Sequence, residues 1–92
     1  MPRRYRCRHD IAAAILRAII GRGGAKTSHI AMAAGLPLDR ARGILQEMER
    51  AGLVYYDGES RAYAATERAY EWLAVYELLE SIFSPPPTTG RT

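Results

Sequence analysis

Apolar positions recur along this chain with two different periods, and the change of period divides it into helices and one hairpin. Isoleucine and alanine repeat at helical spacing over residues 8–20, which predicts a first helix that ends in the glycines of residues 21–24. Thr27 or Ser28 is expected to cap a second helix, which ends at Gly35. The residues that the second helix is expected to bury are Ile30, Ala31 and Ala34.

A third helix follows, with Pro37 expected in its first turn, where the missing N–H group costs nothing. At 100° per residue, its apolar side chains share one face and its polar side chains share the opposite face. The apolar face holds Ala41, Ile44, Leu45 and Met48. The polar face holds Asp39, Gly43, Gln46 and Arg50, with Arg40 and Arg42 on its flanks. Gly52 is expected to end this helix.

Beyond Gly52 the residues favour strands. Residues 53–56 and 61–64 are predicted to form two short strands joined by a turn at Asp57-Gly58, and Thr66 is expected to cap a fourth helix over residues 67–83. The predicted fold class is therefore mainly α with a small β-hairpin, in the order helix-turn-helix, wing and C-terminal helix. The predicted divisions are a basic arm (1–7), a winged helix-turn-helix domain (8–65), the C-terminal helix (66–83) and a disordered tail (84–92).

Charge is distributed unevenly between the two halves of the chain. Residues 1–50 hold ten Lys/Arg and four Asp/Glu, a balance of +6, whereas residues 51–92 hold three Arg and six Asp/Glu, a balance of −3. A basic half beside an acidic half favours directed contact with a polyanion. The apolar stretches are too short to span a bilayer, no signal-peptide core follows the basic start, and the single Cys7 allows no internal disulfide. These features predict a cytoplasmic protein with no membrane partner.

The segment of residues 21–27 imitates a phosphate-binding P-loop. The motif needs a glycine directly before the lysine, on a loop that leaves a strand. Here Ala25 precedes Lys26, and the loop leaves a predicted helix. A glycine-rich helix end explains the same residues.

No other residues form a pattern typical of catalysis or metal binding. His9 and His29 have no cysteine or carboxylate at ligand spacing around them, so no metal is expected. Asp10 and Glu47 or Glu49 could be imagined as an acid pair, but nothing in the pattern would bury them. We therefore expect no enzyme, no cofactor and no metal.

The polar face of the third helix is the strongest functional signal. Arg and Gln side chains match the edges of guanine and adenine, so Arg42, Gln46 and Arg50 suit a helix that enters the major groove of DNA. Gly43 in mid-helix costs about 1 kcal/mol relative to alanine, which suggests a need for close backbone approach. Asp39 faces the same way and would repel phosphate. The alternative is an ordinary solvated helix face.

Further cations extend the expected DNA surface. The sequence predicts phosphate contacts from the arm, from the start of the second helix, from the third helix and from the wing. These residues are Arg3 and Arg4; Lys26, Ser28 and His29; Arg40; and Arg61. For the arm, a frayed terminus is the alternative.

The last predicted helix is unusually apolar, with eleven apolar residues among the fifteen of 69–83. One apolar stripe would suffice to dock it on its own domain, whereas two stripes imply a second partner. Another copy of the chain is the expected partner, through Trp72, Tyr76, Leu79 and Phe83, and four glutamates on this helix favour antiparallel pairing. The other stripe holds Val75, Leu78 and Ile82. The alternative is that this helix fills the core of its own domain.

Several segments of the chain resemble archaeal winged-helix proteins. They are residues 6–16, Lys26-Thr27-Ser28-His29-Ile30, Ala34-Gly35-Leu36-Pro37, Ile44-Leu45 with Ala51-Gly52-Leu53-Val54, and 63–68. Two groups are similar: small predicted transcriptional regulators, and ten-kilodalton crenarchaeal DNA-binding proteins that dimerise through an antiparallel coiled coil of the last helix. The chain departs from them at Pro37, where the family has a polar cap, and at Ala69, where it has glycine.

The residues and the resemblance together predict binding of double-stranded DNA by a homodimer. The dimer would act in the cytoplasm, at the nucleoid, as a transcriptional regulator or as a chromatin-type architectural protein. The alternative is a winged-helix interaction module of a transcription-related complex, in which the last helix docks a different protein.

Overall fold

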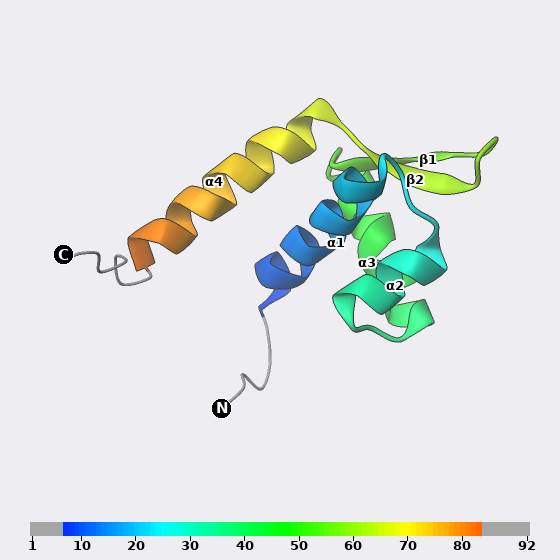
Figure 1. Cartoon of the computed structure of the whole chain (residues 1–92), viewed down its shortest axis with the longest axis horizontal. Helices are drawn as coiled ribbons and strands as arrows, with labels where there is room; N and C mark the ends of the chain where they lie inside the picture. The colour runs from blue at the N-terminus through cyan, green and yellow to red at the C-terminus, as the bar shows by residue number, and fades with distance from the viewer. Residues whose placement is uncertain (1–6, 84–92) are drawn as a thin grey trace.

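The computed structural model describes residues 7–83, and its elements follow the predicted order (Figure 1). They are α1 (Arg8–Arg22), α2 (Thr27–Ala34), α3 (Leu38–Arg50), β1 (Val54–Asp57), β2 (Ala62–Ala65) and α4 (Glu67–Phe83). The predicted fold class, mainly α with one small hairpin, is confirmed. Residues 1–6 and 84–92, with Arg3, Arg4 and the predicted tail, lie outside the described residues.

The glycines after α1 serve to end the helix. The helix continues to Arg22, two residues beyond the predicted end, because Gly23 is the first residue in the left-handed region, at φ 67°. Gly24 follows at φ 121°, and its N–H donates to the Ile19 carbonyl at 2.9 Å. Both positions favour glycine because a side chain would be strained there. Their geometry accounts for the glycines without a bound phosphate.

Two predicted helix starts are wrong by one residue. Neither Thr27 nor Ser28 caps α2, because Lys26 is the N-cap residue and no side chain accepts a hydrogen bond from the first turn. Pro37 lies just before the first turn of α3 as its N-cap, at φ −62° and ψ 152°. In both cases the residue before the helix is already extended. Proline fixes only φ, so it suits either position.

The hairpin is antiparallel and pairs Val54 with Ala65 and Tyr56 with Tyr63. Its strands begin one residue later than predicted, because the N–H of Leu53 bonds to the Met48 carbonyl at the end of α3. A further bridge, absent from the sequence prediction, joins Ala25 to Tyr63 through N–H···O bonds of 3.0 and 2.8 Å. The loop before α2 is thereby tied to the wing.

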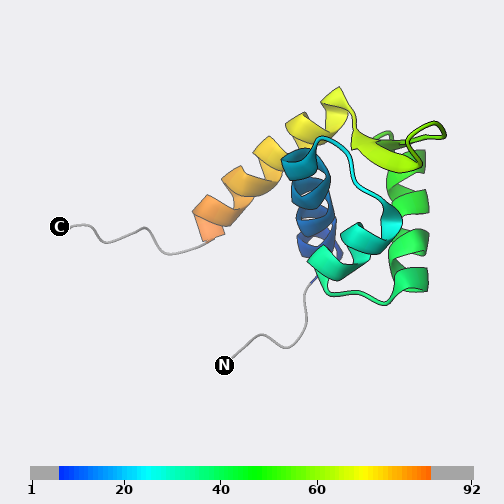
Figure 2. The ribbon, with the colours of Figure 1, turned by 45° about the vertical axis from the view of Figure 1, so that its right-hand side comes forward.

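The core lies around α1, which Figure 2 shows between α4 and α3. Its fully buried large side chains are Ile15, Leu16, Ile19, Ile30, Leu45 and Val54. The burial predicted for α2 is confirmed; in α3, Ala41, Leu45 and Met48 are buried and Ile44 is half-buried.

Thr66 caps α4 as predicted, because its hydroxyl oxygen accepts the Ala69 N–H at 3.3 Å. The same hydroxyl donates to the Gly52 carbonyl at 2.6 Å, so this threonine also ties α4 to the end of α3.

Candidate nucleic-acid interface

The polar face of α3 points away from the domain. Ala41, Leu45 and Met48 are buried on the opposite face of the helix. Because the helix repeats about every 3.6 residues, their burial determines which residues lie on the outer face. The exposed residues are Asp39, Arg42, Gly43, Gln46 and Arg50. A Cβ built at Gly43 meets no atom within 4 Å beyond the neighbouring backbone of α3 itself. The glycine is therefore not required by packing inside the described chain.

The wing and the start of α2 form a second part of the surface. A cleft of about 510 Å³ is lined by Lys26, Ser28 and His29 of α2 and its N-cap, and by Tyr55 and other residues of the wing. The first-turn N–H groups of α2 have no side-chain cap, and a helix start of this kind attracts anions. Lys26 and Ser28 are exposed and His29 is half-buried. The bridge from Ala25 to the wing holds this arrangement together.

One flank of α3 adjoins the wing. Burial raises the pKa of Tyr63, Glu49 and Tyr56 raise it further, and Arg42 opposes them. Tyr63 also meets Tyr56 edge-on, with ring centroids 5.1 Å apart. Arg42 is thus close enough to Tyr63 of the wing for its charge to lower the pKa of that tyrosine.

The wing turn places Arg61 in an unusual backbone conformation. Its φ is 57°, in the left-handed region that glycine or asparagine normally occupies at such a turn. The turn is fastened by Asp57, which accepts hydrogen bonds from the Glu59 N–H and the Ser60 hydroxyl, each at 3.1 Å. Arg61 is exposed.

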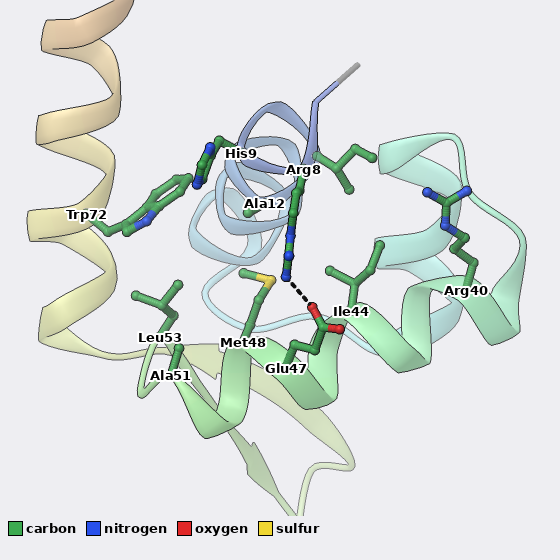
Figure 3. A pocket seen from close by; sticks show the side chains of 11 residues that line it. Arg8, His9, Ala12, Arg40, Ile44, Glu47, Met48, Ala51, Leu53 and Trp72 are labelled. Carbon is green, nitrogen blue, oxygen red and sulfur yellow. Dashed lines mark hydrogen bonds and ion pairs between the residues drawn. The ribbon is translucent and has the colours of Figure 1, made fainter. Parts of the chain in front are cut away.

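Arg40 lies on the other flank of α3, away from the wing. It lines a hollow between α3 and α1 together with Arg8 and Glu47, and the Arg8 guanidinium is 2.7 Å from the Glu47 carboxylate (Figure 3). The imagined acid pair of Asp10 and Glu47 is absent, because these carboxylates bind different partners. Arg40 therefore lies away from the cleft that Lys26, Ser28 and His29 line.

Charge on the candidate surface is mixed. The charges of α3 balance, because the helix carries three arginines, Arg40, Arg42 and Arg50, and three acidic residues, Asp39, Glu47 and Glu49. The α4 helix carries four glutamates and one arginine, Arg68, so it is acidic. The charge gradient between the halves of the chain thus becomes an acidic α4 on one side of α1, with α3 on the other (Figure 2). Because α3 is itself balanced, strong attraction to a polyanion needs cations from outside this helix.

The α4 residues predicted for a dimer fall into two groups. Trp72 and Tyr76 stack on each other at 5.5 Å and pack against the core of their own chain. Tyr76 donates a hydrogen bond to Asp10 of α1, which is the main reason why its pKa is raised to about 12. Leu79 is 57% exposed, and the side chain of Phe83 lies outside the described residues.

The sequence prediction missed one aspect of the surface. Tyr55 and Tyr56 are exposed on the wing, where aromatic rings suit contact with sugars or bases, whereas the sequence pattern identifies them only as strand residues. On α4, the predicted stripe of Val75, Leu78 and Ile82 is exposed, and so are Leu79 and Tyr70. Helical periodicity separates the two apolar stripes of α4, but it does not tell which of them α1 covers.

The described residues contain few other features that would direct chemistry. Within residues 7–83, no three His, Cys, Asp or Glu side chains are grouped so that they could hold a metal ion. No helix there combines the length and the apolar character that crossing a membrane requires.

The family model described as winged helix-turn-helix matches residues 5–83, which covers every element of the described fold. No curated protein is detectably similar to the chain.

Proposed function

We propose that this chain, which belongs to the winged helix-turn-helix family, binds double-stranded DNA through α3, the start of α2 and the wing. The observation that carries the proposal is the outer face of α3. Gly43 at its centre leaves open space where any other residue would place a side chain. Gln46 and Arg50 flank that opening on the same exposed face. This combination suits close approach of the α3 backbone to a groove.

Each part of the surface has a separate role in this proposal. Gln46 and Arg50 reach base edges, since their planar groups match purine edges, and Arg42 contacts the phosphates along the groove. Lys26, Ser28 and His29 hold a phosphate at the uncapped start of α2. Arg61 on the wing, and Arg3 and Arg4 outside the described residues, add cations. Arg40 serves the phosphates on the far flank of α3.

Salt dependence of binding tests the proposal. If a dimer neutralises about six to eight phosphates, log affinity falls against log salt with a slope of about −5 to −7. Fluorescence anisotropy with two unrelated labelled duplexes, each at low and moderate salt, measures this slope. Equal affinity for both duplexes indicates an architectural protein, and a strong preference indicates a regulator. A flat salt response, or no binding at low salt, refutes DNA binding.

We further propose that the chain is a homodimer joined through α4. Val75, Leu78, Leu79 and Ile82 leave an apolar face that is uncovered within the described residues, and a single chain rarely exposes such a patch. The radius of gyration is 14.6 Å, whereas a globular chain of this length has about 12 Å, because α4 projects from the domain (Figure 1). Pairing two such helices covers the face. The glutamates of α4 favour antiparallel pairing.

Leu79→Glu tests the dimer without disturbing the fold, because Leu79 is 57% exposed. Sedimentation is expected to give a folded monomer for this variant and a dimer for the wild type. The monomer binds DNA more weakly because two linked sites become one. Met32→Glu is the matched control, since Met32 on α2 is 75% exposed and distant from α4 in sequence. A wild-type monomer at tens of micromolar contradicts the dimer.

The runner-up function is a winged-helix interaction module of a transcription-related complex. The balanced charge of α3 and the exposed apolar face of α4 are the observations that support it. In that case α4 docks a different protein, and the anisotropy experiment shows no binding. In either function the chain acts without catalysis, in the cytoplasm, and for the DNA-binding form at the nucleoid.

A further inference from the structure

A hollow of about 590 Å³ lies between α1, α3 and α4, on the side of α3 that faces α1 (Figure 3). We call it the α1–α3 hollow. Core side chains of Ile11, Met48 and Leu53 line its floor, and they keep exposed fractions of 7%, 4% and 7%. Its volume falls within the range of about 300–1,000 Å³ that is usual for small-ligand sites.

Two arginines and a histidine line the rim of this hollow. Arg8 and His9 come from the start of α1, and Arg40 comes from α3 (Figure 3). The only carboxylate among the described lining residues is Glu47, which binds the Arg8 guanidinium at 2.7 Å. The rim thus carries two guanidinium groups against one carboxylate. Trp72 of α4 forms the wall opposite Arg40.

We infer that the α1–α3 hollow binds a small organic acid, with its carboxylate on Arg8 and its apolar body on the core floor. Glu47 shows where a carboxylate sits, because it already occupies the Arg8 guanidinium in the free protein. An external carboxylate can exchange with it, since both side chains are exposed and an exposed ion pair is weak. Arg40 supplies the additional attraction. The apolar floor selects against inorganic anions, which gain nothing from it.

Binding there would act on α3. The ion pair of Arg8 and Glu47 is a direct side-chain link between α1 and α3. A ligand that takes over Arg8 releases the Glu47 carboxylate on the helix proposed to meet DNA. An uncompensated negative charge on α3 repels phosphate, so the ligand is expected to weaken DNA binding. This consequence, unlike the ligand site itself, rests on the proposed function.

The fluorescence of Trp72 reports binding directly, because it is the only tryptophan of the chain and lines the hollow. The full chain is titrated with phenylbutyrate and, separately, with phenylbutanol, which has the same apolar body and no charge. We expect a saturable change with phenylbutyrate at a concentration about tenfold lower than with phenylbutanol. No change with phenylbutyrate, or equal affinity for the two probes, overturns the site.

Three variants test the assigned residues. Arg8→Gln is expected to weaken phenylbutyrate binding about tenfold and to leave phenylbutanol unchanged. Arg22→Gln is the matched control, because it removes the same charge from the other end of α1. Ala51→Phe fills the hollow from an exposed position with ordinary helical backbone and is expected to abolish binding of both probes. An equal loss in Arg22→Gln, or full binding in Ala51→Phe, contradicts the inference.

The DNA measurement separates this inference from the proposed function. Saturating phenylbutyrate is expected to weaken duplex binding about fivefold, and phenylbutanol at equal occupancy is expected to have less effect. Unchanged duplex affinity refutes the link through Glu47. If Trp72 responds but the free protein binds no duplex, the proposed function fails and the ligand site stands. If duplex binding is normal and Trp72 never responds, only the ligand site fails.

Discussion

Replacing Gly43 by alanine should make the protein more stable and worse at binding DNA. Gly43 lies in the middle of α3, is exposed, and has no atom beyond the neighbouring backbone of α3 within 4 Å of the position that a Cβ would take. The methyl group therefore meets nothing inside the described chain. Alanine is favoured over glycine in a helix interior by about 0.8–1 kcal/mol. For a domain of this size, that gain raises Tm by about 4–8 °C.

The effect on DNA has the opposite sign. If the α3 backbone approaches a groove at Gly43, the added methyl group occupies the space of closest contact. The loss of one good base-pair contact costs about 1–3 kcal/mol of binding free energy. We expect the methyl group to have an effect of this size, which is a loss of affinity of about fivefold or more. Thermal unfolding by circular dichroism and anisotropy with a labelled duplex measure the two effects on the same samples.

Gly21→Ala is the control for this experiment. Gly21 is also an exposed helical glycine with open space around its built Cβ, but it lies at the end of α1. It should give a smaller rise in Tm, because helix ends fray, and leave DNA binding unchanged. Unchanged DNA affinity in Gly43→Ala, with the expected rise in Tm, would falsify the assignment of this face. A fall in Tm would instead contradict the open space around Gly43.

Three further outcomes are expected. Gln46→Ala should cost about 1–3 kcal/mol on a preferred duplex if Gln46 reads a base, whereas Arg42→Ala should weaken all duplexes alike and flatten the salt slope by about one. Tyr76→Phe should lower the free energy of unfolding by about 1 kcal/mol at neutral pH. The pKa of Tyr76 is raised to about 12 in the folded protein, whereas it is about 10 in the unfolded chain. The hydrogen bond therefore contributes its full stabilisation below a pH of about 10 and loses it as the pH rises through about 12. The stability difference from wild type, measured by urea unfolding, should therefore shrink between these pH values; a constant difference would contradict the assigned bond. Arg61→Gly should relieve the strain of a positive φ and raise the free energy of unfolding by about 0.5–1 kcal/mol, while it weakens DNA binding. A fall in both the free energy of unfolding and the DNA affinity would argue for a purely structural role of Arg61.

Local features of the sequence were sufficient to predict the order of elements. Helical spacing identified the buried residues Ile30, Ala31 and Ala34 of α2, because an amphipathic helix has one face for its domain. Thr66 was recognised as a cap because its hydroxyl serves the adjacent turn. These properties depend on neighbours within a few residues. They are readable without knowing the tertiary structure.

The wrong starts arose where a distant segment fixes the backbone. The pairing of Ala25 with Tyr63 extends the chain up to Lys26, so α2 begins without a side-chain cap. The contact of α1 with α4 also lies beyond local reasoning. Periodicity gives α4 two apolar stripes, but only the hydrogen bond from Tyr76 to Asp10 and the packing of Trp72 decide which stripe α1 covers.

The candidate site was predicted in its residue types but not in its grouping. Arg40 and Arg42 looked equivalent on the two flanks of α3. The fold gives them different surroundings, because Arg42 adjoins the wing and Arg40 lines the α1–α3 hollow. Arg8 and Glu47 are 39 positions apart in sequence. No pattern along the chain relates them, so the hollow could be found only after α1 and α3 were placed together.

Two residues of the proposed DNA surface break local rules in opposite directions. Gly43 stands in a helix where alanine would be more stable, and Arg61 stands at a left-handed position where glycine would be less strained. Neither choice improves the fold, because open space surrounds Gly43 and Arg61 is exposed. Departures from local preference that the structure does not require are expected at functional sites. Contact with a duplex would explain both residues, because Gly43 lets the α3 backbone come close and Arg61 offers a cation to the phosphates.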